Sequence, residues 1–215
     1  MTTERFPGRL ALSARIREAV LKRILAGELK PGDRLLEMRL ADEFGTSQAP
    51  VREALRELEM SGLVETSRNR GTRVRAIGED ELAEIYDVRA ELEGYAASLA
   101  VRELQERLPE LKRTIREMGG LARRRDVIGF GEANARFHRL IVEAAGNSTL
   151  LEVWSRLDVR SRSALNLVRT SANLTATARS HGAIIEAIET GRAATIRRAI
   201  KDHILAFRPQ PAPIG

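Results

Sequence analysis

The sequence predicts a mainly α-helical protein of two domains. Apolar residues recur at helical spacing along nearly the whole chain, whereas short alternating segments typical of strands occur only between residues 63 and 77. Aromatic residues make up 4% of the chain and hydrophobic residues 43%, a composition typical of an aliphatic core between helices. The fold class that follows is an N-terminal winged helix-turn-helix plus a C-terminal antiparallel six-helix bundle.

The first domain is expected over residues 1–78 and begins with two amphipathic helices. Residues 13–26 place apolar side chains in one row, and the segment GELKPGDRL then supplies a turn through its Gly and Pro-Gly. A second, short helix carries Leu40 and Phe44 on one face and ends at Gly45. Because another helix follows at once, the pattern indicates a helix-turn-helix.

That third helix has two faces of different chemistry. Ser47 can cap its N-terminus and Pro50 fits its first turn, where the missing N–H costs little. Apolar residues form one face, while Gln48, Arg52 and Arg56 lie four residues apart on another. Arg can pair with guanine or phosphate and Gln with adenine, and a recognition helix points its N-terminal end at base edges. We therefore expect Ser47 and this polar row to contact DNA.

A basic β-wing is expected directly after this helix. Residues 63–66 and 72–77 alternate as strands do, and SRNRG between them predicts a hairpin with Arg70 and Gly71 at its tip. A Gly beside an Arg lets the backbone approach a narrow groove. The alternative is an ordinary helical subdomain whose arginines form a solvated face, but that leaves the succession of helix, turn, helix and wing unexplained.

Charge and composition agree with a DNA-binding role. The net charge is +6, and residues 1–78 hold 15 Lys and Arg against 11 Asp and Glu, so +4 of the excess lies in the smaller domain. Such an excess favours phosphate contact and makes DNA affinity salt-dependent. The chain has no cysteine, which excludes disulfides and thiolate zinc sites. No apolar run is long enough to cross a membrane, and we expect a cytoplasmic protein.

The second domain is expected over residues 79–207, followed by a disordered tail over residues 208–215. Acidic residues in GEDEL begin its first helix, and Leu108-Pro109, Gly146-Asn147-Ser148 and Gly191 separate later ones. The predicted helices span residues 82–103, 108–125, 127–145, 149–170, 175–190 and 192–206.

The three histidines of the chain, His138, His181 and His203, all fall in this second domain on different predicted helices. Asn134 and His138 are four residues apart, so both leave the same helix face, and one cavity could receive all four side chains. Imidazole nitrogens suit Zn, Ni, Co, Mn or Fe. The other interpretation is that each is a hydrogen-bonded core histidine, and spacing by itself leaves both open.

The motifs LKPGDRL, LADEFGTSQAPVREALRELEMSGLVE and NRGTRV resemble the winged helix of the GntR family of bacterial transcription regulators. The later segments YDVRAELEGYAASLA, NARFHRLIVEAAGNSTL, SHGAIIEAI and DHI resemble the helical effector-binding domain called FCD, found in the FadR-type branch. With six predicted helices rather than seven, the second domain is more similar to the shorter domain of the VanR-like subgroup. The resemblance implies a homodimer that reads a palindromic operator in double-stranded DNA.

The resemblance also implies roles for single residues. FCD domains commonly bind a divalent metal through one Asp and three His, which here are Asn134 and the three histidines. Asn134 removes one negative charge from that site, which should weaken the affinity or alter the metal preference. Arg89 matches an Arg that faces the effector cavity in relatives and could clamp a carboxylate. Gln48 stands where the family usually has Arg, whereas Arg52 matches the family pattern.

The function expected from the sequence is a ligand-responsive regulator, a repressor, whose helical domain binds a divalent metal and a small carboxylate effector. Zinc is the favoured metal, with nickel, manganese or iron as alternatives. Three other interpretations are a metal sensor with no organic effector, a non-specific DNA-binding protein, and a metal-dependent hydrolase. The hydrolase is disfavoured because no general base is evident beside the histidines and the winged helix would have no purpose.

Overall fold

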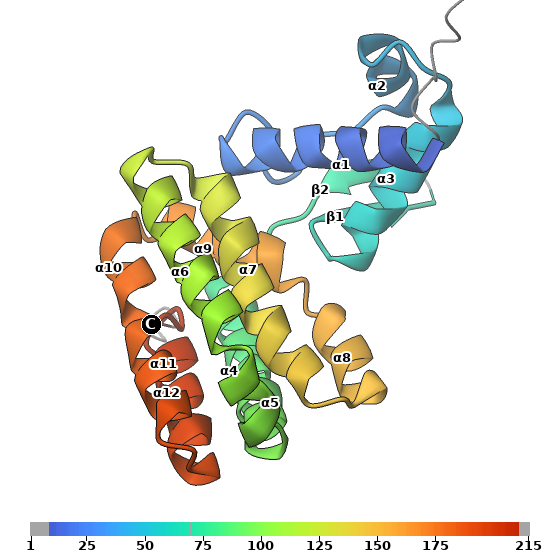
Figure 1. Ribbon diagram of the computed structural model, residues 1–215. Helices are drawn as coiled ribbons and strands as arrows, with labels where there is room; N and C mark the ends of the chain where they lie inside the picture. Colours follow the sequence, from blue (N-terminus) through green and yellow to red (C-terminus); the bar gives the residue numbers. More distant parts are fainter. Residues whose placement is uncertain (1–8, 69, 211–215) are drawn as a thin grey trace, which may run out of the picture. The chain divides into compact units, whose positions relative to one another are not determined.

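The computed structural model describes residues 9–68 and 70–210 of the 215-residue chain. It divides into two compact units, residues 1–77 and residues 78–215 (Figure 1). The N-terminal unit contains, among the described residues, α1 (Arg9–Leu25), α2 (Glu37–Glu43), α3 (Gln48–Met60), β1 (Val64–Ser67) and β2 (Gly71–Val74).

The core of the N-terminal unit lies between α1 and α3. Ile16 and Val20 of α1 and Val51 and Leu58 of α3 are fully buried, which is the row that the helical spacing predicts. Burial of each such side chain stabilises the folded unit by about 1.5–3 kcal/mol. Helix α2 ends before Gly45, whose φ of +60° is readily adopted only without a Cβ, so the chain can turn directly into α3.

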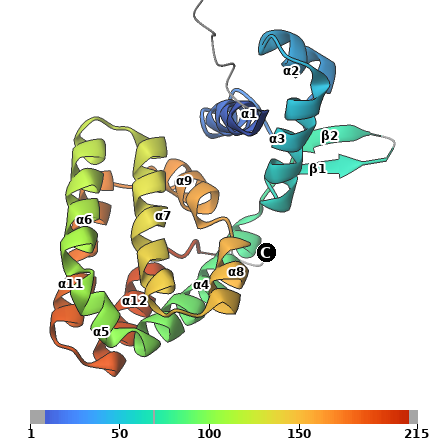
Figure 2. The same cartoon turned by 45° about the vertical axis from the view of Figure 1, so that its right-hand side comes forward.

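The predicted hairpin is present, with β1 and β2 antiparallel and Val64 opposite Val74 (Figure 2). The chain segment before α2 pairs with its other edge, which the sequence did not indicate. Leu35 N–H donates to the Thr72 carbonyl at 2.9 Å, and Val74 N–H donates to the Asp33 carbonyl at 3.0 Å. This pairing satisfies backbone groups on β2 that would otherwise be exposed. Asn69, in the predicted turn, lies outside the described residues.

The C-terminal unit is helical throughout its described part. All six predicted segments are helical, but three of them are interrupted, which gives nine helices among residues 78–210. They are α4 (Glu79–Leu99), α5 (Val101–Glu106), α6 (Leu108–Arg123), α7 (Val127–Ala144), α8 (Ser148–Ser155), α9 (Val159–Arg169), α10 (Leu174–Ser180), α11 (Gly182–Glu189) and α12 (Ala193–Leu205).

The three interruptions have different backbone causes. Ala100 leaves helical angles between α4 and α5 (φ −114°, ψ 27°). Asp158, between α8 and α9, takes a left-handed conformation (φ 42°, ψ 56°), and its side chain caps α9. His181 keeps helical angles, so α10 and α11 are separated by one residue only. Helix propensity does not distinguish these points from continuous helix.

Helix α7 lies at the centre of the C-terminal unit and packs against α4, α6 and α9. Its Phe130, Phe137 and Ile141 are fully buried. Helix α12 packs along α4 (Figure 1). These contacts bring α4, α7 and α12, which are distant in sequence, around one interior.

The end of the chain is held against α4 over part of the segment expected to be disordered. Arg208 donates two hydrogen bonds to the Asp87 carboxylate, at 2.7 and 2.9 Å, and Pro209 is buried. Residues 211–215 lie outside the described part. Among the helices that are described, none is long and apolar enough to cross a membrane.

Candidate functional site

The predicted DNA-contacting residues belong to α3, from its N-cap to Arg56, and to the hairpin after it, elements that Figure 2 labels. Ser47 occupies the N-cap position of α3, but its side chain makes no cap hydrogen bond, so the expected capping contact is not seen. Gln48 is the first residue of the helix, and Pro50 stands in its first turn as predicted. Arg56 is exposed one turn beyond Arg52.

The structure joins Gln48 and Arg52 directly. Arg52 Nη2 donates to Gln48 Oε1 at 2.9 Å, and Arg52 Nε donates to Glu37 Oε2 at 2.6 Å. The Arg52 side chain is still 56% exposed. The face of α3 predicted to read DNA is therefore polar, open to solvent and held in one arrangement by Glu37.

The wing tip has the backbone that its sequence predicts. Arg70 is exposed, its N–H donates to the Ser67 carbonyl at 3.1 Å, and Gly71 begins β2 with φ +67°. Only Gly adopts this left-handed angle at little cost. A positively charged hairpin end is thus presented to solvent, as a groove-binding wing requires.

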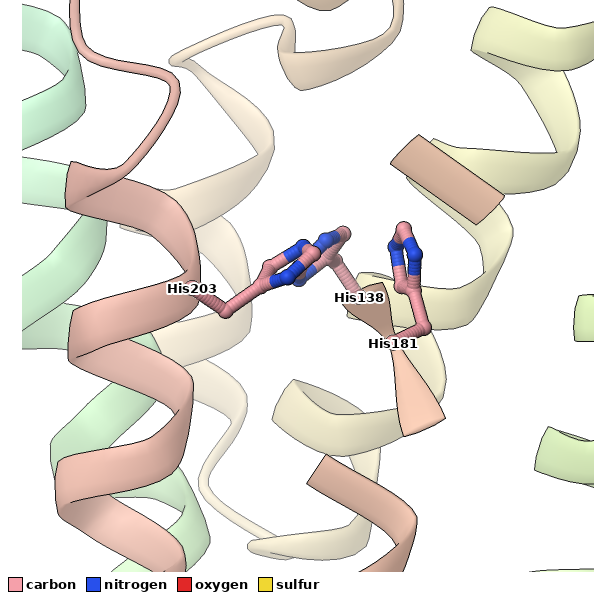
Figure 3. A group of neighbouring side chains, drawn as sticks. All are labelled: His138, His181 and His203. Atoms are coloured by element: carbon pink, nitrogen blue, oxygen red, sulfur yellow. The ribbon is translucent and has the colours of Figure 1, made fainter. Parts of the chain in front are cut away.

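In the C-terminal unit, the three predicted histidines meet. His138 comes from α7, His181 from the residue between α10 and α11, and His203 from α12, and all are buried (Figure 3). One nitrogen of each ring lies within 4.8 Å of the others. The Asn134 Oδ1 atom lies 3.0 Å from His181 Nε2, so the fourth predicted member joins the group.

Hydrogen bonds at the outer nitrogens fix the tautomer of His138 and His181. His138 Nδ1 lies 2.5 Å from the Glu93 Oε2 atom, and His181 Nδ1 lies 2.9 Å from the Thr177 carbonyl. A carboxylate and a carbonyl only accept, so both Nδ1 atoms carry the proton. The Nε2 atom of each ring therefore keeps its lone pair, and His138 Nε2 has no hydrogen-bond partner in the described chain.

The hydrogen bonds of His203 indicate the same tautomer. Its Nδ1 lies 3.3 Å from the Ser180 hydroxyl, whose own proton is donated to the Thr177 carbonyl at 2.8 Å. Ser180 can then only accept from His203 Nδ1, which again leaves the lone pair on Nε2. Three imidazole lone pairs thus converge beside the Asn134 amide, and a cation would bind the lone pairs and the amide oxygen together.

Glu93 on α4 forms the hydrogen bonds that orient part of this group. Its carboxylate is fully buried and accepts from Arg89 Nε at 2.6 Å, from Trp154 Nε1 at 2.9 Å and from His138. Burial raises the pKa of Glu93, but the charge of Arg89 and the contacts with His138 and Trp154 outweigh it and lower the pKa to about 2. Glu93 is therefore ionised and acts as an acceptor.

The histidines are neutral in this environment. Burial and then the charge of Arg89 lower the pKa of His138, although Glu93 acts in the opposite direction. Burial, followed by the neighbouring histidines, lowers the pKa of His203, and burial lowers the pKa of His181 to about 3. Neutral imidazole is the form that binds metal ions. The donor set of three nitrogens and one oxygen fits a divalent transition metal better than calcium or magnesium.

Arg89 is buried, at 4% exposure, and lines the same interior as the histidines. Its Nη1 donates to the Ser163 hydroxyl at 3.3 Å, and its guanidinium lies 5.6 Å from the Tyr86 ring centre. The cavity between these groups is about 20 Å³, room for about one water molecule. Its lining is Tyr86, Arg89, Asn134, His138, Ser163, Asn166, Leu167, Thr177, His203, Ile204 and Phe207.

The sequence reasoning missed Glu93 and the polar residues of α9. An acidic residue four positions after Arg89 usually indicates an exposed helix pair, yet both of these side chains are buried. Their position on an otherwise apolar face of α4 was the available signal. Ser163 and Asn166 of α9 are also buried and line the cavity, and no role was predicted for either.

A winged helix-turn-helix with a basic reading face, followed by a helical domain around a buried polar cavity, defines a DNA-binding transcription regulator. Residues 12–74 match the model described as bacterial regulatory proteins, gntR family, and residues 84–206 match the FCD domain. The chain belongs to the GntR family of bacterial regulatory proteins and carries an FCD domain. The resemblance inferred from the sequence is thereby confirmed.

Relatives agree with this class, and a solved structure agrees in fold. The chain is 34% identical to a probable D-xylose utilization operon transcriptional repressor of Paenarthrobacter nicotinovorans, over 95% of this chain and 90% of that protein. It is 30% identical to the gluconate operon transcriptional repressor of Bacillus licheniformis, over 72% and 63%. The fold is similar to Escherichia coli McbR/YncC, with a TM-score of 0.72 and 24% identity, over 91% and 94% of the two chains. These relatives are transcription regulators, not enzymes.

Proposed function

We propose that this protein is a dimeric repressor whose operator binding is modulated by a small carboxylate, with a divalent metal ion in its helical domain. The observation that carries the proposal is the convergence of three buried, neutral histidines with outward-facing Nδ1 protons. Three buried imidazoles without a cation would leave lone pairs unsatisfied, which costs free energy. A bound metal would relieve that cost.

The residues proposed to hold the metal are Asn134, His138, His181 and His203. Glu93, Thr177 and Ser180 orient the three rings through their Nδ1 atoms, as outer partners of metal-binding histidines commonly do. Four protein ligands without an Asp give a less negative site, and zinc is the favoured ion, with nickel, manganese or iron as alternatives. A carboxylate oxygen would bind the ion as a fifth ligand, because zinc sites can expand from four ligands to five.

Arg89 is the proposed clamp for the carboxylate. Glu93 holds its Nε edge, which leaves the terminal nitrogens directed to the cavity side where Ser163 lies. The cavity of about 20 Å³ holds no organic acid as it stands, so the walls must move when one binds. Such a movement suits a regulator, because a ligand shifts a conformational equilibrium only when it binds one of the two conformations more tightly than the other.

DNA binding is assigned to Ser47, Gln48, Arg52, Arg56, Arg70 and Gly71. In a homodimer, two copies of α3 would enter successive major-groove turns of a palindromic operator. Two of the relatives named above are repressors, one probable repressor of a D-xylose utilization operon and one repressor of a gluconate operon, which supports repression here as well. Tenfold release from DNA requires about 1.4 kcal/mol of coupling between the effector site and the winged helix.

A metal sensor without an organic effector is the second candidate, and one observation favours it. Arg89 already has Glu93 and Ser163 as partners, and the cavity has room for little more than one small ion or water. In that case metal binding alone would change the affinity for DNA. The two candidates share the metal site and differ in whether an acid is required.

Thermal unfolding separates these candidates. The full-length protein is heated with and without a chelator, and with zinc in the presence of a panel of small carboxylates. Because a ligand that binds only the folded state raises Tm, one acid that raises Tm only in the zinc-loaded protein supports the effector proposal. Stabilisation by zinc and by no acid supports the metal sensor or a purely structural ion. No effect of zinc or chelator would contradict both.

A further inference from the structure

The contact between Arg52 and Gln48 determines which hydrogen-bonding groups the start of α3 presents. Arg52 Nη2 donates to Gln48 Oε1 at 2.9 Å. A guanidinium has donors and no acceptor, so the atom of Gln48 that it meets must be the carbonyl oxygen. The orientation of the Gln48 amide is therefore set by Arg52. Its NH₂ group, with two donors, is left for another partner.

Arg52 is itself oriented by Glu37. Arg52 Nε donates to Glu37 Oε2 at 2.6 Å, and Glu37 stands in the first turn of α2, where the helix dipole favours a carboxylate. The guanidinium has five N–H donors and uses two of them in these bonds. Along residues 9–68 and 70–210, the remaining three have no partner. They lie on a side chain that is 56% exposed.

We infer that Gln48 and Arg52 form a donor-only reading pair that selects keto bases in the major groove. Guanine presents the acceptors N7 and O6, and thymine presents O4, whereas adenine and cytosine present an amino group at the corresponding place. Arg52 can take both acceptors of a guanine. The Gln48 NH₂ group then favours guanine or thymine at the base it meets and disfavours adenine or cytosine.

This assignment differs from the usual expectation for glutamine. A free Gln pairs with adenine in a bidentate way, with its oxygen accepting from N6 and its NH₂ donating to N7. Here the oxygen is engaged by Arg52, and the positive charge beside it disfavours an approaching amino group. The base preference at this position thus follows from a contact between two protein side chains.

The inference rests on the proposed role of α3 as the reading helix, and one selection experiment tests both separately. Full-length protein is used to enrich sequences from a pool of random duplex DNA, with wild type and the Gln48→Glu variant compared. Glutamate keeps the size of the side chain and still accepts from Arg52, but it has no donor. At one base pair of each half-site, wild type should enrich the pairs with the keto base on one strand, G·C and T·A, about tenfold over the pairs with the keto base on the other strand, C·G and A·T. Gln48→Glu should reverse that strand preference at this base pair alone.

The control is Lys22→Gln, an exposed residue of α1, which changes the net charge by the same amount outside the reading helix and should weaken all sequences alike. If Gln48→Glu alters no position, or leaves the keto base of every altered pair on the same strand as in wild type, the donor-only pair is wrong while α3 can still read DNA. If wild type enriches no sequence at all, the proposed sequence-specific function itself fails.

Discussion

Glu93 Oε2 lies 2.5 Å from His138 Nδ1, and this bond fixes which nitrogen of His138 faces the cavity. The same carboxylate accepts from Arg89, so a single buried group on α4 orients both the proposed metal ligand and the proposed effector clamp. A change at the metal ligand His138 should therefore affect the clamp Arg89 through Glu93, and the reverse. The relationship also explains why a charged residue is tolerated at 0% exposure.

Glu93→Gln is expected to weaken zinc binding by about 10- to 100-fold, because a neutral amide makes the imidazole it contacts a poorer ligand. Affinity is measured by competition with a chelator of known zinc affinity. Glu91→Gln is the matched control, since Glu91 stands on the same helix but is exposed and pairs with Lys201 and Arg197. Equal zinc affinities in the two variants would show that Glu93 does not support the site.

Metal-free protein is expected to lose stability in acid through Glu93. Its pKa is about 2 in the folded state against an ordinary value of 4.5, so its contribution is complete above pH 4.5 and is lost as the pH falls towards 2. The loss is roughly 3 kcal/mol at most. Comparing urea unfolding at pH 6 and pH 3 measures the larger part of this loss. The Glu93→Gln variant is less stable, but its free energy of unfolding should change less between the two pH values than that of wild type. An equal change in both proteins would contradict the assignment.

Asn134→Asp is expected to raise zinc affinity, because it adds a negative charge beside three imidazoles. Without metal, the same buried carboxylate should destabilise the fold, since its nearest partner is the lone pair of His181. The rise in Tm on adding zinc should therefore be larger in this variant than in wild type. A smaller rise would indicate that the side chain of residue 134 does not reach the ion.

Gly71→Ala is expected to cost about 1–2 kcal/mol of stability, because alanine is strained at φ +67°. Gly27→Ala is its control, with φ +73° at the end of α1 and open space for the added Cβ. Both variants should lose similar stability in denaturant unfolding. Only Gly71→Ala should weaken operator binding, and equal operator affinities would remove the wing tip from the DNA interface.

The sequence predicted the features that follow from local spacing. The row Gln48, Arg52 and Arg56 and the hairpin after it lie within 30 residues of one another, and their helical and strand periods place them without knowledge of the tertiary fold. The histidines were predictable as a group because each stands on the apolar face of an amphipathic helix, and such faces meet in one core.

The rest depends on tertiary contacts that spacing does not encode. Glu93 and Arg89 have the pattern of an exposed helix pair, and only the packing of α7 and α8 against α4 shows that they are buried. The left-handed turn at Asp158 and the pairing of Leu35 with Thr72 likewise join residues whose geometry is set by neighbouring elements. Arg208 is held in place because its side chain donates a hydrogen bond to Asp87 of α4.

The most direct test of the account measures operator affinity by fluorescence anisotropy, using zinc-loaded and chelated full-length protein with each of a panel of small carboxylates. We expect one acid to weaken operator binding at least tenfold in the zinc-loaded protein, and to have no effect after chelation or in Arg89→Met. An affinity that no acid changes, in a protein that still binds zinc and the operator, would contradict the effector site. A change produced by zinc alone would identify a metal sensor.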